Sequence, residues 1–317
     1  MKALRFSKFG PPSVLAIEDV PPPEPREGEA LVRVSAAAIN PSDLKNVAGH
    51  FPTTTLPRTP GRDFSGIVVE GKRYKGQEVW SSGPGLGVTR DGAQAEYVTV
   101  PEEALSLKPD ALTMEQAAAI GVPFTTAWFA LTHAVEIRAG ETILIVGATG
   151  AVGQAATQIA NWRKARVLGA ARSSSPIPGA DAVINTIVDD MRERVLELTQ
   201  GKGADAVFDT VGGVMFEPAL RSLRLGGRQV AITSTRDRRV SFDLVDFYHN
   251  QSRLIGVDSM KFTPRDMAAM ADALLPGFEA KALTPPALEA VPFERAVEAY
   301  QRIASGERGA KQVLIFS

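Results

Sequence analysis

The feature that most constrains this chain is a glycine-rich turn between an apolar run and a helical pattern. Residues 142–153 read T-I-L-I-V-G-A-T-G-A-V-G, and Ile143 to Val146 has the character of a strand buried on both faces. From Gln154 to Arg163 the apolar residues follow helical spacing. Strand, glycine turn and helix in this order predict a dinucleotide-binding fingerprint, although such a turn can also be only a tight connection.

The residues of the turn suit a pyrophosphate group. They read A-x-G-x-x-G, so an alanine replaces the usual first glycine without adding a bulky side chain. Gly150 and Gly153 would let the backbone approach the phosphates, and the free N–H groups at the helix start would face the negative charge. We therefore predict that the cofactor is bound by Ala148, Thr149, Gly150, Ala151, Val152 and Gly153.

The end of the second predicted strand indicates which cofactor is preferred. NAD-binding proteins usually carry an acidic residue there to hold the ribose 2′-hydroxyl. Here Arg166–Ala170 runs into Ala171, Arg172 and Ser173, with no acid. Arg172 could pair with a 2′-phosphate, with Ser173 as an additional donor, so the pattern favours NADPH. The alternative is an ordinary solvated arginine.

Two more strand ends carry polar residues that fit a cofactor site. Residues 204–213 read as a buried strand that ends in a polar turn containing Thr210 and Val211, and a later strand ends in Thr233 and Ser234. The carboxyl ends of parallel strands are where the nicotinamide and its ribose would lie. Both could equally be plain loops.

Composition excludes several classes of function. The chain of 317 residues is 44% hydrophobic and 22% charged, with a net charge of −1, so it offers no field that would attract nucleic acid or an anionic membrane. It has no cysteine and only three histidines, which argues against a metal site. It shows neither a signal peptide nor a run of about 20 apolar residues, so we expect a cytoplasmic protein without a membrane partner.

The pattern of apolar and turn residues changes along the chain. Residues 1 to about 120 contain short alternating runs between proline and glycine turns, which predicts a barrel-like β domain. After helical stretches at 115–120 and 125–133, strands and helices alternate to about residue 260, which predicts a doubly wound parallel sheet. In the first region, Pro60 to Gly66 is predicted to form a turn before a strand at 67–69. In the second region, a helix is predicted at 215–223.

Several motifs occur in an order that resembles one family over nearly the whole chain. They are I-N-P-S-D, P-G-R-D-F-S-G, A-x-G-x-x-G, F-D-T-V-G-G, L-R-L-G-G-R and A-Y-x-x-I-A-S-G-x-x-G-A-K-Q-V-L. Together they resemble the medium-chain dehydrogenase/reductase superfamily, and more closely its zinc-free quinone oxidoreductase branch. The resemblance implies an α/β protein with a GroES-like β-barrel catalytic domain at residues 1–120, completed by 261–317. It also implies a Rossmann NADP-binding domain at 121–260.

The resemblance bears on metal use and on the reaction. Zinc-using relatives carry Cys-Gly-x-Asp where this chain has Asn40-Pro41-Ser42-Asp43, and Gly-His-Glu where it has Gly61-Arg62-Asp63. Without a Lewis acid, oxidation of a simple alcohol would lose its main means of stabilising the alkoxide. We therefore expect an NADPH-dependent enzyme that transfers hydride to a quinone or an α,β-unsaturated carbonyl compound without zinc. A hydrogen bond would stabilise the anion that develops on the acceptor oxygen.

Four residues are candidates for the catalytic site. The resemblance implies that Asn40 orients the acceptor oxygen and that Thr126 lies beside the nicotinamide. Phe51 stands where relatives have tyrosine in a G-x-Y-P turn, so a tyrosine hydroxyl is missing, and His50 could substitute as an acid. Lys261 follows the last Rossmann strand and could enter the substrate site. The alternatives are a local cap for Thr126, an apolar or surface role for Phe51 and His50, and a solvated Lys261.

Other functions remain open at this stage. An acyl-thioester reductase would call for a basic site entrance, which the scattered cations at Arg62, Lys72, Arg73 and Lys75 do not establish. A NADPH-binding sensor with little turnover is also possible. Relatives commonly form homodimers through an edge strand, and residues 254–257 could serve that purpose, but a monomer is not excluded.

Overall fold

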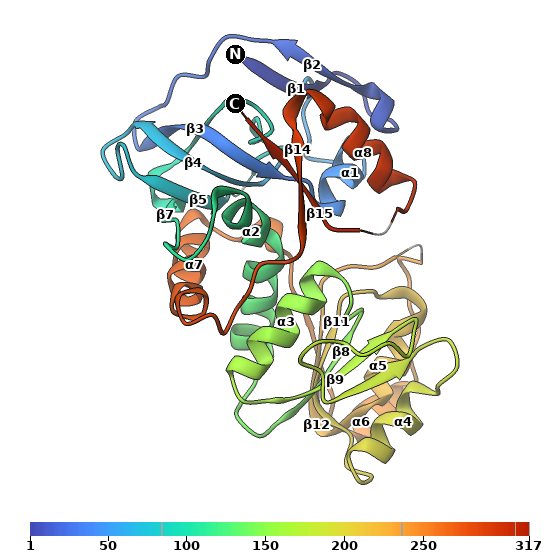
Figure 1. The fold of residues 1–317 in the computed structure, drawn as a ribbon. Helices are drawn as coiled ribbons and strands as arrows, with labels where there is room; N and C mark the ends of the chain where they lie inside the picture. The colour runs from blue at the N-terminus through green and yellow to red at the C-terminus, as the bar shows by residue number, and fades with distance from the viewer. Residues whose placement is uncertain (84, 236, 308, 317) are drawn as a thin grey trace. The chain divides into compact units, whose positions relative to one another are not determined.

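The computed structural model describes residues 1–83, 85–235, 237–307 and 309–316, and the chain forms two compact units (Figure 1). Unit 1 comprises Met1–Thr125, Met260–Ala280 and Pro285–Ser317. Unit 2 comprises Thr126–Ser259 and Lys281–Thr284.

Unit 1 is built on a mixed sheet that joins strands from both ends of the sequence. Its strand order is β14-β15-β3-β4-β5-β7, and β6 also pairs with β3. The strands are β3 (Glu29–Ala38), β4 (Asp63–Glu70), β5 (Glu78–Ser82), β6 (Tyr97–Pro101), β7 (Ser106–Leu107), β14 (Leu288–Pro292) and β15 (Lys311–Ile315). A separate hairpin consists of β1 (Lys2–Phe6) and β2 (Leu15–Asp19). The C-terminal strand β15 therefore completes a sheet that begins near the N-terminus.

Buried apolar side chains hold unit 1 together. One cluster joins alternate residues of β3, including Val32 and Val34, to Phe64 of β4 and Val98 of β6. The helices of this unit are α1 (Pro41–Val47), the first part of α2 (Met114–Phe129), α7 (Pro264–Glu279) and α8 (Ala296–Ala304). Phe124 of α2 and Phe278 of α7 meet edge to face, with ring centroids 4.9 Å apart. Such an aromatic contact adds specificity to the area that both rings bury.

Unit 2 is a parallel sheet of six strands with the order β10-β9-β8-β11-β12-β13. Since β8 is the first of these strands along the chain, this is the 3-2-1-4-5-6 order of a doubly wound dinucleotide-binding fold, and that prediction is confirmed. The order reverses between β8 and β11, whose carboxyl ends lie next to each other. The strands are β8 (Thr142–Val146), β9 (Arg166–Ala171), β10 (Ala182–Asn185), β11 (Ala204–Asp209), β12 (Leu223–Ala231) and β13 (Arg253–Gly256).

Helices cover both faces of this sheet, with α3 (Ala151–Trp162) on one side and α4, α5 and α6 on the other (Figure 1). The latter three are Met191–Leu198, Phe216–Arg221 and Leu244–His249. Leu144 and Val146 of β8 share a buried cluster with Val195 of α4 and Leu220 of α5. Neighbouring strand residues point to opposite faces, so Ile143 and Ile145 face α3. This double covering explains why the strand is apolar throughout.

The structure corrects three local predictions. The two helices expected at 115–120 and 125–133 are one α-helix, α2, because Pro123 is accommodated inside it. A π-helical turn at Ala130–Ala134 follows α2. The turn expected at 60–66 already enters β4 at Asp63, since Asp63 to Ile67 pair with β5. The helix expected at 215–223 ends at Arg221, and Leu223 opens β12.

Among the described residues, no helix is both long enough and apolar enough to span a membrane.

Candidate active site

The glycine turn of unit 2 leaves no room for a Cβ at two of its positions. Gly147, directly after β8, has a φ of +83°, and a Cβ there would lie 2.4 Å from Oγ1 of Thr210. A Cβ on Gly153 would lie 2.3 Å from the carbonyl oxygen of Gly147. Ala148, at the first position of the fingerprint, is fully buried. Glycine is therefore required at positions 147 and 153, and the sequence reading of the motif missed Gly147, whose signal is its place directly after the strand.

The amino end of α3 offers unpaired backbone donors at this turn. The helix begins at Ala151, three residues earlier than predicted, and Gly150 precedes it in extended conformation without a side-chain cap. The first turn closes when the N–H of Gln154 donates to the carbonyl oxygen of Gly150 at 2.8 Å. No described residue accepts from the N–H groups of Ala151, Val152 and Gly153. Free donors at a helix start, without a side chain in the way, fit the pyrophosphate of a nicotinamide cofactor.

The loops after β11 and β12 meet the same edge of the sheet. Oγ1 of Thr210 donates to the carbonyl oxygen of Val146 at 2.7 Å, which ties the end of β11 to the end of β8. Gly212 has a φ of +66°, and a Cβ there would lie 2.5 Å from the carbonyl oxygen of Thr233. Val211 and Ser234 flank these contacts and are partly exposed. The structure thus gathers the predicted residues at 210, 211, 233 and 234 at the carboxyl edge that also carries the glycine turn.

Arg172 and Ser173 follow β9, the neighbour of β8, and both are exposed. Within the described part of the chain, Arg172 makes no ion pair or side-chain hydrogen bond. An unpaired guanidinium on the carboxyl edge of the sheet is available for a phosphate. In the glycine turn itself, the carbonyl oxygen of Thr149 accepts a hydrogen bond from Nε2 of Gln154 at 2.8 Å.

Asp209 is a residue at this edge that sequence reasoning did not select. It ends β11, is fully buried, and its Oδ1 accepts from the N–H groups of Val211 and Gly212 at 2.9 and 2.8 Å. No described residue pairs with Oδ2. Burial raises the pKa of this carboxyl, while the two backbone hydrogen bonds oppose the shift. Asp209 therefore fixes the loop that carries Thr210 and Val211.

Thr126 lies near the end of α2 and not at its start, so the alternative of a local helix cap is wrong. Its side chain is only 4% exposed, and Oγ1 has no hydrogen-bond partner among the described residues. A buried hydroxyl without a partner is costly, and a bound ligand could remove that cost.

Asn40 belongs to a buried polar cluster of unit 1. It caps α1, and its backbone N–H donates to Oδ2 of Asp43 at 2.8 Å. Its Nδ2 donates to Oδ2 of Asp63 at 2.9 Å, and its Oδ1 accepts from Nζ of Lys311 at 2.6 Å. The N–H of Val122 in α2 also donates to Oδ2 of Asp63 at 2.9 Å. Sequence reasoning selected Asn40 but not Lys311, which is distant in the chain.

Charge is unusually concentrated in this cluster. Asn40, Asp43, Arg62 and Asp63 are each no more than 3% exposed. Burial raises the pKa of Asp43 to about 7, and the nearby Asp63 adds to the shift. Burial lowers the pKa of Lys311, while the carboxylates of Asp63 and Asp43 oppose that effect. Two cations and two carboxyl groups thus share a volume from which water is largely excluded.

The other predicted catalytic residues lie apart from these contacts. Phe51 is partly buried, and His50 beside it is exposed. Lys261 ends a short 3₁₀ helix and is exposed. Among the described residues, no hydrogen bond joins any of the three to the cluster around Asn40.

The residues at the expected metal positions do not fit zinc. Lys311 already places a cation on Oδ1 of Asn40, and the guanidinium of Arg62 has no lone pair to offer a metal. Among the described residues, no group of three or more His, Cys, Asp or Glu side chains could hold a metal ion.

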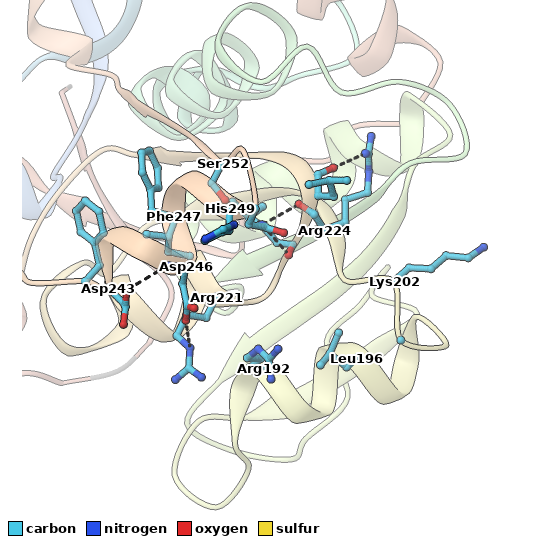
Figure 2. A pocket seen from close by; sticks show the side chains of 16 residues that line it. Arg192, Leu196, Lys202, Arg221, Arg224, Asp243, Asp246, Phe247, His249 and Ser252 are labelled. Atoms are coloured by element: carbon cyan, nitrogen blue, oxygen red, sulfur yellow. Dashed lines mark hydrogen bonds and ion pairs between the residues drawn. The ribbon is translucent and has the colours of Figure 1, made fainter.

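A cavity of about 380 Å³ in unit 2 is a separate feature, lined by residues of α4 and α6 and by Lys202 on the loop before β11 (Figure 2). Since Lys202, Leu223 and Ser252 mark the starts of three parallel strands, the cavity lies at the edge opposite the glycine turn. Its arginines are paired with carboxylates, as when Arg221 pairs with Asp246 at 3.8 Å. It is therefore a separate feature from the glycine turn.

Two family profiles match the chain. One, described as alcohol dehydrogenase GroES-like domain, covers residues 26–110, and the other, described as zinc-binding dehydrogenase, covers residues 151–275. A zinc-type alcohol dehydrogenase-like protein of Schizosaccharomyces pombe is 38% identical over 100% of this chain and 98% of its own. A quinone oxidoreductase of Pongo abelii is 31% identical over 99% and 97%. The mycobacterial protein Rv1454c, solved in complex with NADPH, superposes with a TM-score of 0.87 at 27% identity and covers 100% of both chains.

The pKa of Asp43 predicts a specific dependence of stability on pH. A carboxyl whose pKa is raised on folding binds its proton more tightly in the folded state. Its contribution is therefore full below pH about 4, is lost as pH rises to about 7, and is constant above. Asp43→Asn removes this titration. The unfolding free energy of the variant minus that of the wild type should rise across this window, by at most about 1.4 kcal/mol per pH unit.

Denaturant unfolding from pH 4 to pH 8 measures that difference. Asp110→Asn, at an exposed position of the same unit, controls for the loss of one carboxyl group. A difference for Asp43→Asn that stays constant over the whole range would contradict the assignment.

Proposed function

Because the chain belongs to the medium-chain dehydrogenase/reductase superfamily, in its quinone oxidoreductase-like branch, we propose that it is an NADPH-dependent reductase of quinones or α,β-unsaturated carbonyl compounds that works without zinc. That it is an oxidoreductase of this nicotinamide-dependent family follows from the relatives. The preference for NADPH, the acceptor class and the independence from zinc are our proposals.

One observation carries the proposal. At the positions where zinc-using relatives have metal ligands, this chain has a buried amide and guanidinium, and the ammonium of Lys311 lies 2.6 Å from Oδ1 of Asn40. On this proposal, protein cations take the place of the metal that would polarise an alcohol. An acceptor that is already electron-poor needs only hydrogen bonding and positive charge near the oxygen that becomes anionic.

The residues of the chain can be given roles in this reaction. A bound reduced nicotinamide supplies the hydride. The N–H groups of Ala151, Val152 and Gly153 would hold the pyrophosphate, and Arg172 with Ser173 would hold the 2′-phosphate. Thr210, Val211, Thr233 and Ser234 would border the ribose and nicotinamide. Asn40 would donate a hydrogen bond from Nδ2 to the acceptor oxygen, and Phe51 and Lys261 would border the acceptor. The hydroxyl of Thr126 would form a hydrogen bond with the cofactor.

We also propose that the protein is a cytoplasmic homodimer. Strand β13 is at the edge of its sheet, and the nearby helix α6 exposes Leu244, Val245 and Tyr248 by 64%, 52% and 56%. A free strand edge beside exposed apolar side chains is suited to pairing with a second copy.

Sedimentation velocity should give twice the mass of the chain, and Leu254→Lys on β13 should shift the protein to a monomer. A wild-type monomer at micromolar concentration would contradict this.

The acceptor class can be tested by following the loss of reduced-nicotinamide absorbance. The panel contains an ortho-quinone, a para-quinone, a 2-alkenal, a cyclic enone and a simple aldehyde. We expect turnover with a quinone or an enone and none with the simple aldehyde, because only conjugated acceptors spread the developing charge without a metal. Tight NADPH binding without oxidation by any acceptor would overturn the proposal in favour of a sensor, and turnover of enoyl thioesters alone would favour the thioester reductase.

Arg172 gives a prediction about cofactor choice. Arg172→Ala should weaken NADPH binding by about 10- to 100-fold, since a charge-assisted contact to phosphate is worth about 1.5–3 kcal/mol. NADH binding should change little, because that cofactor has no 2′-phosphate. Fluorescence titration of both cofactors measures this, with Arg163→Ala at the opposite end of α3 as the control. Equal weakening of NADPH and NADH would show that Arg172 does not bind the 2′-phosphate.

A further inference from the structure

Lys311 is held next to Asn40 by the sheet of unit 1. It opens β15, which runs antiparallel to β3 with Val313 opposite Ala38. This register, continued by two residues, sets Lys311 opposite Asn40, and the N–H of Ile39 donates to the carbonyl oxygen of Gln312 at 3.0 Å. The sheet itself therefore holds the lysine against the amide, and the contact does not depend on a flexible loop.

The amide of Asn40 is fixed at both ends. Its Oδ1 accepts from the ammonium of Lys311 at 2.6 Å, and one hydrogen of Nδ2 goes to Oδ2 of Asp63 at 2.9 Å. These two bonds determine which end of the amide is oxygen and which is nitrogen. The second hydrogen of Nδ2 has no acceptor among the described residues. The side chain thus has one donor left, and its direction is set by Lys311 and Asp63 together.

The ammonium also changes the chemistry of the amide. An amide oxygen that accepts from a cation withdraws electron density from its nitrogen, so the remaining N–H becomes a stronger donor. Low solvation of the cluster enlarges this effect, as the lowered pKa of Lys311 and the burial of Asn40 and Asp63 indicate. Removing the charge would weaken this donor and remove one of the two bonds that orient it.

We propose that Lys311 is a positioning residue, which acts through Asn40 to orient and polarise the N–H that meets the acceptor oxygen. This inference rests on the proposed function. The lysine supplies, through one hydrogen bond, part of the positive charge that zinc-using relatives take from their metal. It need not touch the substrate, and it transfers no proton in this role.

A double-mutant cycle with Asn40 tests the inference. Lys311→Met should lower kcat, and the single-turnover rate of NADPH oxidation with the best acceptor, by about 10- to 100-fold, the value of a hydrogen bond to a charged group. The dissociation constant for NADPH should stay within about twofold, because the free-energy loss falls on the reaction step. In the background of Asn40→Ala, Lys311→Met should cause no further loss, since the residue through which it acts is gone.

Conservative variants separate positioning from folding. Lys311→Arg keeps the charge and the donor and should recover most of the rate, whereas Lys311→Gln keeps only a neutral donor and should not. Lys108→Met is the matched control, because Lys108 is a lysine of the same unit that donates to the carbonyl oxygen of Leu112 at 2.7 Å and pairs with Glu78. It should leave kcat unchanged. Circular dichroism establishes that each variant compared is folded, and Lys311→Gln replaces Lys311→Met in the cycle if the latter is not.

Two results would overturn the inference. Equal losses from the Lys311 substitution with and without Asn40 would show that the lysine acts independently of the amide. A selective loss of NADPH binding, with the single-turnover rate intact, would show that it serves the cofactor. Failure of the proposed function itself is distinguishable, because the wild-type protein would then oxidise NADPH with none of the acceptors.

Discussion

The buried carboxylate of Asp63 is the constraint on which unit 1 depends most. Its Oδ2 gathers the amide of Asn40 and the N–H of Val122, so three segments that are far apart in sequence converge on one oxygen. Gly121 must be a glycine for this approach, since a Cβ there would lie 2.4 Å from Oδ1 of Asp63. An unpaired charge at this depth would be strongly destabilising. Lys311 supplies compensating charge near both Asp63 and Asp43, and Arg62 supplies it near Asp43.

In unit 2, the glycine turn after β8 presents backbone groups and no charged side chains. The apolar strand β8 is covered on both faces, and the turn at its carboxyl end, which we propose binds the cofactor, has no charged side chains. Glycine at 147 and 153 lets the turn close tightly, and the free N–H groups of α3 provide the positive end of the helix. Arg172, one strand away, adds a full positive charge. Under the proposed function, the turn would accept any dinucleotide, and the arginine would select NADPH among them.

Much of this arrangement was predictable because its signals are local. The glycine fingerprint, the alternation of strands and helices, and the polar ends of β11 and β12 each occupy a few consecutive residues, and the parallel sheet follows from their order. Asn40 could be selected from its motif. Lys311 could not, since its contact with Asn40 arises from strand register between β15 and β3, and no spacing in the sequence encodes it. Asp209 was missed because an aspartate at a strand end looks the same whether exposed or buried. The sequence did not predict that α2 is a single helix, because a proline such as Pro123 normally interrupts a helix.

We propose that protein cations replace a metal in this protein, and metal analysis of the active protein can decide this. The protein is treated with a strong chelator and dialysed, its zinc content is measured by mass spectrometry, and NADPH oxidation with a quinone is measured on the same sample. We expect full turnover with zinc far below one ion per chain, and no gain in turnover when zinc is added. Loss of turnover on removal of the metal, with recovery on adding zinc back, would contradict it.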